Sequence, residues 1–205
     1  MTNLDLEKQY EGQIVAGIDE VGRGPLAGPV VSAAVIINPD IFIEDIKDSK
    51  KLTEKKRSQI SSQIMNSYTY SIGVAEVSEI EEMNILEATK LSMIRAFKGL
   101  EIEPDIALVD GNMKFPDPRF KSIVKGDTLS RSIAASSIIA KVYRDKLMQE
   151  LSIEYPQYGW EKNAGYGTKA HIEAIKKYGP TRHHRLSFLS NILQSSGSYT
   201  KMHSK

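Results

Sequence analysis

The chain has 205 residues, of which 40% are hydrophobic and 26% are charged, a composition typical of a soluble globular protein. It contains no cysteine, which excludes a disulfide framework and thiolate chemistry and leaves any metal to carboxylates or histidine. No apolar run reaches the roughly 20 residues of a membrane-spanning helix, and the acidic N-terminal stretch does not resemble a secretory signal. We therefore expect a soluble cytoplasmic protein without a membrane partner.

The formal net charge of +1 is divided unevenly along the chain. Residues 1–111 hold 11 Lys or Arg against 19 Asp or Glu, whereas residues 112–205 hold 16 against 7. Such asymmetry indicates a basic face for a polyanion beside an acidic half that could hold cations. Two solvated surfaces of opposite sign would explain the same counts, so charge alone leaves both interpretations open.

Short apolar runs predict strands in the first part of the chain. An apolar run over 14–18 is followed by a Gly- and Pro-rich turn over 22–29, and a second strand is expected over 30–37. Residues 68–77 alternate and are rich in β-formers, which predicts a third strand. A short buried strand is expected over 106–109.

Capping signals and apolar spacing predict the helices. Their expected starts are Thr53, the capping box at Ser78–Glu81, Asp127 or Thr128, and about Lys169. The third helix should run to about Leu151, and the fourth to Tyr178 with Gly179 as its C-cap. Strands come first and helices dominate at the end, which predicts one α/β domain over 1–194 with a helical C-terminal part from about residue 152. The polar stretch 195–205 is expected to be a disordered tail.

Carboxylates end two of the apolar runs. Asp19 and Glu20 follow Ile18, and Asp110 follows Val109. In open α/β sheets, ligands bind where strands end. An acid at such a position is also a common turn or cap residue, so each one alone has an ordinary structural explanation.

Asp145 is unusual because it shares a helix face with apolar residues. It lies three residues after Val142, seven after Ile138 and eleven after Ala134. Burying a lone carboxylate is costly, so Asp145 should have a cation or a hydrogen-bond donor as its partner. Pairing with the neighbouring Arg144 or Lys146, or a place at the edge of the stripe, would be a purely structural alternative.

A cluster of carboxylates favours a particular kind of metal. Clustered carboxylates repel one another unless a divalent cation lies between them. Oxygen ligands favour Mg²⁺ or Mn²⁺ over Zn²⁺. Two such ions about 4 Å apart would activate a water and stabilise the leaving oxygen in phosphodiester hydrolysis. An acidic cluster beside a basic half therefore indicates a metal-dependent nuclease.

A series of ordered motifs adds a family resemblance. In chain order the motifs are 17–31 (GIDEVGRGPLAGPVV), 48–52 (DSKKL), 109–112 (VDGN), 125–127 (KGD), 132–145 (SIAASSIIAKVYRD), 165–168 (GYGT), and His184-Arg185 before Ser187-Phe188. Together they strongly resemble bacterial ribonuclease HII, over about residues 14–189.

The resemblance implies a ribonuclease H-like fold, with a mixed five-stranded sheet flanked by helices and a helical C-terminal part. It implies an endonuclease that hydrolyses the RNA strand of RNA–DNA hybrids and cuts 5′ of single ribonucleotides embedded in duplex DNA. The expected products carry 3′-hydroxyl and 5′-phosphate ends. The implied partners are RNA–DNA hybrids and ribonucleotide-containing DNA duplexes, which arise in DNA replication and repair. We expect the enzyme to be a monomer.

The resemblance also assigns site residues. The four catalytic, metal-binding carboxylates are Asp19, Glu20, Asp110 and Asp145, which are expected to hold two Mg²⁺ or Mn²⁺ ions. The residues expected to bind substrate are Gly22, Arg23 and Gly24 at the 2′-hydroxyl, Ser49, Lys50, Lys125 and Arg185 at phosphates, and Tyr166 on the neighbouring deoxyribose. His184 is expected to be a structural residue.

The chain departs from the family pattern at one place. Asn163-Ala164 stands where the family commonly shows His-Lys before the Gly-Tyr pair. The loss of a lysine would remove a phosphate contact, so the departure bears on binding strength rather than on the reaction.

Two rival functions remain to be tested. A non-catalytic hybrid-binding module on the same fold would be expected to lack the acids, and all four are present. A DNA exonuclease of similar architecture would cut all-DNA ends, which an assay on matched duplexes would detect.

Overall fold

The computed structural model describes residues 3–46 and 52–194. Its strands are β1 (Val15–Val21), β2 (Val30–Ile36), β3 (Thr69–Ala75), β4 (Ile106–Asp110) and β5 (Phe120–Ile123). Its helices are η1 (Glu7–Tyr10), α1 (Glu54–Ser67), α2 (Val77–Met83), α3 (Ile85–Lys98), α4 (Gly126–Leu129), α5 (Arg131–Glu154), η3 (Pro156–Tyr158), α6 (Trp160–Asn163), α7 (Lys169–Tyr178) and α8 (Leu186–Gln194).

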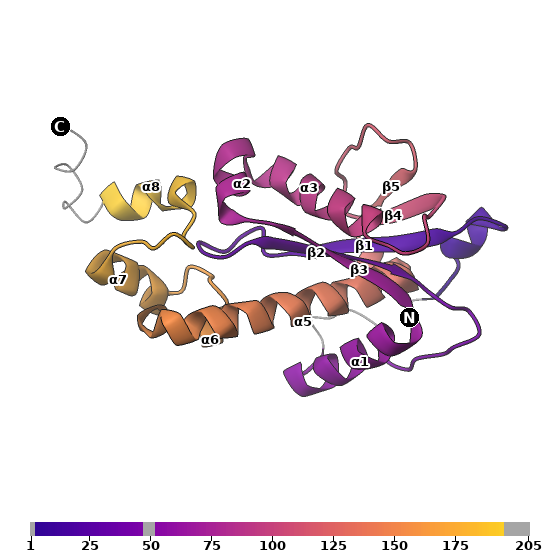
Figure 1. Ribbon diagram of the computed structural model, residues 1–205, viewed down its shortest axis with the longest axis horizontal. Coiled ribbons are helices and arrows are strands. Elements are labelled where there is room, and N and C mark those ends of the chain that lie inside the picture. The colour runs from indigo at the N-terminus through magenta and orange to yellow at the C-terminus, as the bar shows by residue number, and fades with distance from the viewer. Residues whose placement is uncertain (1–2, 47–51, 195–205) are drawn as a thin grey trace.

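The five strands form one mixed sheet in the order β3-β2-β1-β4-β5 (Figure 1). β1, β2 and β3 pair antiparallel, whereas β4 and β5 continue the sheet in parallel with β1. In this register Ile18 lies opposite Ala34 on one side and Val109 on the other. β1 is thus the central strand, and its C-terminal half carries Asp19 and Glu20.

Helices cover both faces of the sheet. α2 and α3 lie on one face, and α5 with α1 lies on the other (Figure 1). Buried apolar side chains from α1 and α5 pack on β2 in one core, and those from α3 pack on β1, β2 and β4 in a second core. β1 and α5 approach so closely that a Cβ on Gly17 would lie 2.2 Å from the Ser132 carbonyl carbon. Only glycine permits this approach, which places the middle of β1 directly against α5.

The C-terminal elements gather at the far end of α5 (Figure 1). Met148 of α5 packs with Tyr158, Trp160, Ile175 and Leu189 in a separate apolar cluster. Tyr158 and Trp160 stack with ring centroids 5.2 Å apart. This cluster anchors η3, α6, α7 and α8 to the helix that also covers the sheet.

The predicted mixed five-stranded α/β architecture is confirmed. Thr53 caps α1, since its side chain accepts a hydrogen bond from the Lys56 amide at 3.3 Å. The predicted helix over 169–178 with Gly179 as C-cap is also present.

Three local predictions were wrong. The capping box uses Glu76 and Glu79 rather than Ser78, and Asn84 at φ 74° separates α2 from α3. The third strand ends at Ala75, because Val77 already belongs to α2. Neither Asp127 nor Thr128 caps the long helix: both lie in α4, and Ser130 caps α5 by accepting from the Ile133 amide. β5 and α8 were not anticipated individually.

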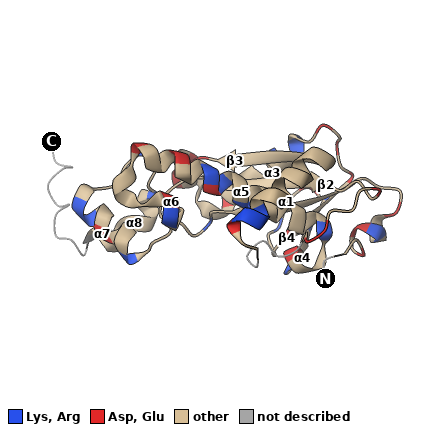
Figure 2. Ribbon diagram, turned by 90° about the horizontal axis from the view of Figure 1, so that it is seen from below, with Lys and Arg blue, Asp and Glu red and all other residues tan. Residues whose placement is uncertain are grey.

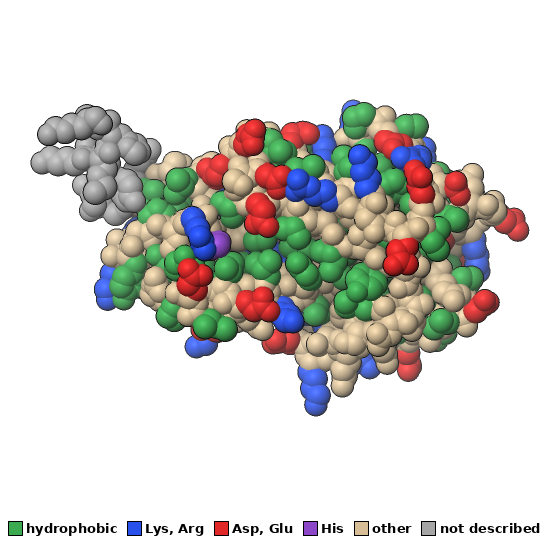
Figure 3. Space-filling model, viewed as in Figure 1, with side chains coloured by type: hydrophobic (Ala, Val, Ile, Leu, Met, Phe, Trp, Pro, Cys, Tyr) green, Lys and Arg blue, Asp and Glu red, His purple; other side chains and the backbone are tan. Residues whose placement is uncertain are grey.

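Charges of both signs are spread over the described elements seen in Figure 2. Basic and acidic residues both occur along α5 and the C-terminal helices (Figure 2). The Arg57–Asp145 and Arg119–Glu103 ion pairs join the two halves of the sequence. On the face seen in Figure 3, hydrophobic side chains gather across the middle, with charged side chains around them. None of the described helices combines the length and the apolar character needed to cross a membrane. The tail predicted over 195–205 lies outside the described residues.

Candidate active site

Sheet topology brings the strand-end acids together. Asp19 follows Ile18 in β1, and Asp110 follows Val109 in β4, directly after the last paired residues of these two parallel neighbours. Glu20 is the next residue of β1, and its amide donates to Asp19 Oδ1 at 2.7 Å. Contrary to expectation, Asp19 and Glu20 lie within the strand rather than after it.

A pocket of about 330 Å³ opens over these acids. Its lining includes Asp19, Glu20, Asp110, Ser137, Lys141 and Tyr166. We call this site the carboxylate pocket. A larger pocket of about 700 Å³ beside η1 lies at the opposite end of β1 and contains none of the acids predicted from the strand ends.

The carboxylate pocket brings acidic groups together in a buried place. Burial raises the pKa of Asp19 well above its ordinary value, and the charges of Glu20 and Asp110 raise it further. A hydrogen bond with Ser137 acts in the opposite direction. Burial also raises the pKa of Glu20, against the opposing effect of the Arg23 cation, whose Nη1 lies 3.4 Å from Glu20 Oε1. Proximity and burial thus disfavour the ionised form of both acids.

The acids of the pocket have the ligand chemistry of a hard divalent cation. Glu20 Oε2 is buried and has no hydrogen-bond partner among the described residues. Buried carboxylate oxygens of this kind are the ligands that Mg²⁺ and Mn²⁺ prefer. Within the described part of the chain, no three His, Cys, Asp or Glu side chains converge tightly enough to hold an ion as they stand. The described acids therefore offer oxygen ligands without yet enclosing a metal position.

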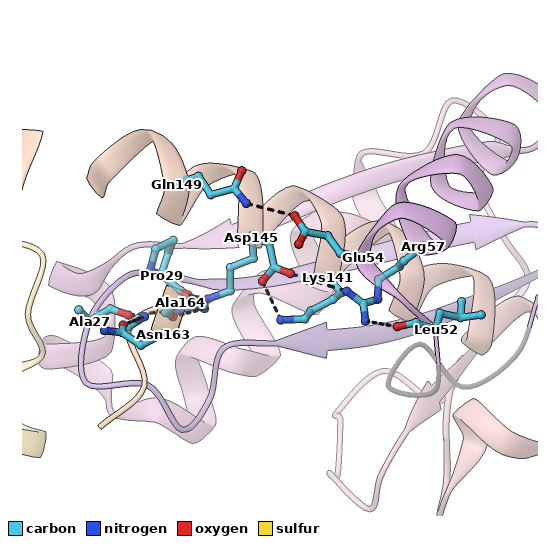
Figure 4. A network of polar contacts seen from close by, with 12 residues as sticks. Ala27, Pro29, Leu52, Glu54, Arg57, Lys141, Asp145, Gln149, Asn163 and Ala164 are labelled. Atoms are coloured by element: carbon cyan, nitrogen blue, oxygen red, sulfur yellow. Dashed lines mark hydrogen bonds and ion pairs between the residues drawn. The ribbon is translucent and has the colours of Figure 1, made fainter. Parts of the chain in front are cut away.

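Asp145 was expected to complete the cluster, but in the structure it is engaged elsewhere. Its Oδ1 lies 2.7 Å from Lys141 Nζ, and its Oδ2 lies 3.9 Å from Arg57 Nη1 (Figure 4). Arg57 comes from α1 and also donates to the Leu52 carbonyl at 2.8 Å. The expected partner cation of Asp145 is therefore present, but it is neither Arg144 nor Lys146. Asp145 is also absent from the described lining of the pocket.

Asp127 is a buried acid that sequence reasoning treated as a helix cap and as part of a matched motif, without a role in the site. Its backbone amide lies 3.3 Å from Asp110 Oδ1. A Cβ on the preceding Gly126 would lie 3.3 Å from the same oxygen and 2.6 Å from Ile133 Cδ1, so a glycine here keeps the two segments close. The Lys-Gly-Asp motif at 125–127 was the available signal, because it contains a carboxylate within a matched segment.

The predicted ribose-reading residues lie beside the acids. Arg23 and Gly24 are exposed, and a Cβ on Gly24 would lie 3.7 Å from Tyr166 Cε1. Tyr166 is 42% exposed and lines the pocket that Asp19 and Asp110 also line. The structure therefore places the Gly22-Arg23-Gly24 turn and the aromatic ring next to the carboxylates.

The predicted phosphate contacts have different outcomes. Lys125 is exposed at the start of α4, with its backbone in the left-handed region at φ 58°. Ser49 and Lys50 lie outside the described residues. Arg185 is fully buried, and its guanidinium donates to main-chain carbonyls. This burial is at odds with the expected direct phosphate contact of Arg185.

His184 is structural, as expected. It is buried, and its Nδ1 accepts from the Thr181 amide at 2.9 Å. Its Nε2 lies 3.2 Å from His171 Nε2, which also accepts from Trp160 Nε1 at 3.0 Å. Because His171 Nδ1 lies 2.9 Å from the Tyr166 carbonyl, the network supports the backbone of the pocket tyrosine.

Comparison with known proteins identifies the family of this chain. The family model described as Ribonuclease HII matches residues 16–191. The chain is 61% identical to the Ribonuclease HII of Orientia tsutsugamushi (strain Ikeda) over 186 residues, which are 91% of either chain. The solved ribonuclease H2 from Pyrococcus horikoshii OT3 is similar, with a TM-score of 0.73 and 29% identity over 90% of this chain and 99% of that one. Bst-RNase HIII, solved in complex with Mn²⁺, shares the fold with a TM-score of 0.72 and 21% identity over 95% of this chain and 72% of that one.

A family model that spans most of the chain and a relative of this identity both show the same family. The relatives are named as a ribonuclease, which is an endonuclease. The chain is therefore assigned as an enzyme rather than as a binding module. The chain belongs to the ribonuclease HII family.

Proposed function

We propose that this protein is a divalent-metal-dependent endoribonuclease that cuts the RNA strand of RNA–DNA hybrids and cleaves 5′ of single ribonucleotides embedded in duplex DNA. The products carry 3′-hydroxyl and 5′-phosphate ends. The observation that carries the proposal is the meeting of Asp19, Glu20 and Asp110 in one pocket beside Tyr166. We further propose that it acts as a monomer in the cytoplasm.

The acids supply the metal ligands in this proposal. Asp19, Glu20 and Asp110 would hold divalent cations through carboxylate oxygens, including the buried, unpartnered Glu20 Oε2. When bound, such cations activate the attacking water and balance charge on the leaving oxygen. Ser137 orients Asp19 through their hydrogen bond. No side chain is required as a dedicated general base.

Asp145 is proposed as the fourth carboxylate, in competition with Asp127. Lys141 and Arg57 balance the charge of Asp145 in the structure, so it must exchange these partners to reach a metal. Asp127 is already next to Asp110 through its backbone amide. Cleavage by Asp127→Asn and Asp145→Asn, measured over a Mg²⁺ titration, decides between them. The variant that has lost a metal ligand should need a higher Mg²⁺ concentration for half-maximal cleavage, and the other variant should not.

Substrate recognition is assigned to the residues beside the acids. A 2′-hydroxyl is both a donor and an acceptor and is the only chemical difference at an embedded ribonucleotide. The exposed Arg23-Gly24 backbone can approach it, while Tyr166 stacks on the adjacent deoxyribose. Lys125, Ser49 and Lys50 are proposed phosphate contacts, whereas burial removes Arg185 from that role.

One gel assay tests the function. Matched end-labelled duplexes containing all DNA, one ribonucleotide, or a full RNA strand are incubated with Mg²⁺, Mn²⁺ or chelator. We expect cutting 5′ of the single ribonucleotide and along the hybrid with either metal, and none with chelator. Degradation of the all-DNA duplex from its ends would favour the exonuclease alternative. Metal-independent cutting, or binding without cutting, would overturn the proposal.

A further inference from the structure

Two fully buried arginines lie beneath the Gly22-Arg23-Gly24 turn. Arg144 comes from the middle of α5, and Arg185 comes from the residue before α8. Among the described residues, neither guanidinium has a carboxylate within ion-pair distance. Burial lowers the pKa of Arg144 to about 10 and, together with the nearby Arg144 charge, that of Arg185 to about 9, so both remain charged at neutral pH. Two buried cations with no described carboxylate in direct contact are costly and call for an explanation.

The Arg185 guanidinium donates its hydrogen bonds to the turn itself. Its Nη2 lies 2.6 Å from the Gly22 carbonyl oxygen and 2.7 Å from that of Gly28, and its Nε also donates to Gly28 at 3.0 Å. Its Nη1 donates to the Arg23 carbonyl at 2.9 Å. The Phe188 ring lies against this guanidinium, with its centroid 5.3 Å away.

Arg144 joins the same turn to the tyrosine segment. It donates to the Ala27 carbonyl at 2.9 Å and to the Pro29 carbonyl at 2.9 Å. Its Nη1 donates to the Ala164 carbonyl at 2.8 Å, two residues before Tyr166 (Figure 4 shows these carbonyls converging). The Leu26 amide, which donates to the Gly165 carbonyl at 2.8 Å, adds a direct link between the two segments. We call Arg144 and Arg185 the arginine clamp.

The glycines of the turn make room for the clamp. Gly22 has φ +95°, and a Cβ there would lie 2.3 Å from Arg144 Nε. Gly28 has φ +84°, and a Cβ there would lie 3.1 Å from Arg144 Nη2 and 2.4 Å from Met148 Sδ. Glycine is therefore required at both positions by the backbone conformation and by the space that the guanidinium fills.

The clamp determines which side of the turn faces outward. The carbonyls of Gly22 and Arg23 point inward to Arg185. No described residue accepts a hydrogen bond from the amides of Arg23 and Gly24, which lie on the exposed part of the turn. Fixing the carbonyls inward leaves these amides available as donors to a ligand on the exposed part of the turn.

We propose that Arg144 and Arg185 are positioning residues for ribonucleotide recognition, which hold the Gly22-Arg23-Gly24 backbone and Tyr166 at a fixed mutual distance. The inference rests on the proposed function, because it needs a substrate whose 2′-hydroxyl is read by that backbone. A duplex with one ribonucleotide offers one productive register, whereas a full hybrid offers many. A displaced turn therefore costs more activity on the single ribonucleotide than on the hybrid.

Arg131 provides a matched control for a purely structural role. It is also buried and donates to a main-chain carbonyl, that of Ile43, while its guanidinium lies 4.4 Å from the centroid of the Phe42 ring. Neither Ile43 nor Phe42 lines the carboxylate pocket. Lysine keeps the charge but loses the planar fork that reaches several acceptors, so Arg→Lys tests the clamp geometry at constant charge.

The experiment compares Arg144→Lys, Arg185→Lys and Arg131→Lys by thermal unfolding and by steady-state cleavage of both substrates. For the two clamp variants we expect kcat on the one-ribonucleotide duplex to fall about 100-fold, a loss typical of a misplacement near 1 Å. On the full hybrid the loss should be about tenfold smaller. Every sugar of its RNA strand carries a 2′-hydroxyl, so a displaced turn can still contact one at another position. Arg131→Lys should lower the melting temperature without changing the ratio of the two activities.

Phe188→Leu is a milder probe if a clamp variant does not fold, because it removes only the ring against Arg185. It should shift the same ratio in the same direction. An unchanged ratio in the folded clamp variants and in Phe188→Leu would overturn the inference. If the wild-type enzyme itself fails to cut the one-ribonucleotide duplex, the proposed function fails instead, so the two failures are distinguishable.

Discussion

The carboxylate pocket and the arginine clamp bury charges of opposite sign in contrasting ways. In the pocket, burial and mutual repulsion raise the pKa of Asp19 and Glu20, and Glu20 Oε2 has no described partner. In the clamp, Arg144 and Arg185 direct their donors to main-chain carbonyls. The buried acids include an oxygen that lacks a described hydrogen-bond partner, and they can bind a cation from solution. The buried arginines donate to main-chain carbonyls and hold the backbone in place. The first region is built for chemistry and the second for position.

Removing one pocket acid should have the largest effect on activity. Asp110→Asn should lower cleavage at least about 1,000-fold, because loss of a group that acts with its neighbours removes most of the catalysis. Its stability should be unchanged or raised, since the substitution relieves repulsion on Asp19 and Glu20. Cleavage rates at saturating Mg²⁺ and urea unfolding measure both quantities.

Asp117→Asn is the control for Asp110→Asn, because Asp117 is paired with Arg119 outside the pocket. It should cleave at the wild-type rate. Near wild-type cleavage by Asp110→Asn would show that the pocket does not hold the reacting groups.

Among the residues that line the pocket, removing the tyrosine ring should have the next largest effect on activity. Tyr166→Ala should reduce cleavage of a one-ribonucleotide duplex about tenfold, toward the low end of the roughly 1–3 kcal/mol of an aromatic stack on a base, because the ring packs on a sugar here. Folding stability should change little, because the ring is 42% exposed. Tyr166→Phe keeps the ring and should retain more activity. Wild-type cleavage by Tyr166→Ala would exclude the proposed role at the junction and leave the metal site unaffected.

Sequence reasoning predicted the pocket better than its surroundings. The acids at 19, 20 and 110 were predictable because the ends of apolar strand-like runs meet at one edge of a sheet. The partners of Asp145 were not, since Arg57 belongs to α1 and local helix spacing contains no information about a contact 88 residues away. Spacing predicted the face of Asp145 and its need for a cation, but not which cation.

The clamp could not be predicted for the same reason. Arg185 looked like a phosphate contact because it is a basic motif residue, and only packing of the distant 22–29 turn against it shows that it is buried. Ser130, rather than Asp127, caps α5 because an additional short helix, α4, occupies residues 126–129. Local capping signals specify that a helix begins nearby, and tertiary contacts select the residue.

Lowering the pH should decrease the free energy of unfolding through His184 and increase it through Asp19 and Glu20. Burial, with the nearby His171 and His183, lowers the pKa of His184 to about 3, so between about pH 6.5 and 3 only the unfolded chain takes up this proton. His184 thus lowers the free energy of unfolding by up to about 1.4 kcal/mol for each pH unit in that window. Asp19 and Glu20 have raised pKa values, so their protonation in the folded state stabilises it as pH falls.

Urea unfolding of the wild type, His184→Asn and Asp19→Asn at pH 7, 6, 5 and 4 separates these contributions. His184→Asn should lose stability less steeply on acidification than the wild type does. Asp19→Asn should lose it more steeply, because the compensating protonation is gone. Parallel curves for all three proteins would contradict both assignments.

The smallest expected effect concerns strain that the clamp holds in place. Ala164 has φ +48°, in the left-handed region that alanine disfavours by about 1–2 kcal/mol, and its carbonyl accepts from Arg144 Nη1. Ala164→Gly removes this strain but gives the unfolded chain more freedom, which costs about 0.5–1 kcal/mol. We therefore expect a net stabilisation of about 0.5 kcal/mol. Ala170→Gly in the first turn of α7 has the same entropy cost but relieves no backbone strain. It should therefore destabilise the protein, as thermal unfolding would show. If both variants are destabilised equally, the left-handed conformation at Ala164 is not a source of strain and the clamp holds a relaxed segment.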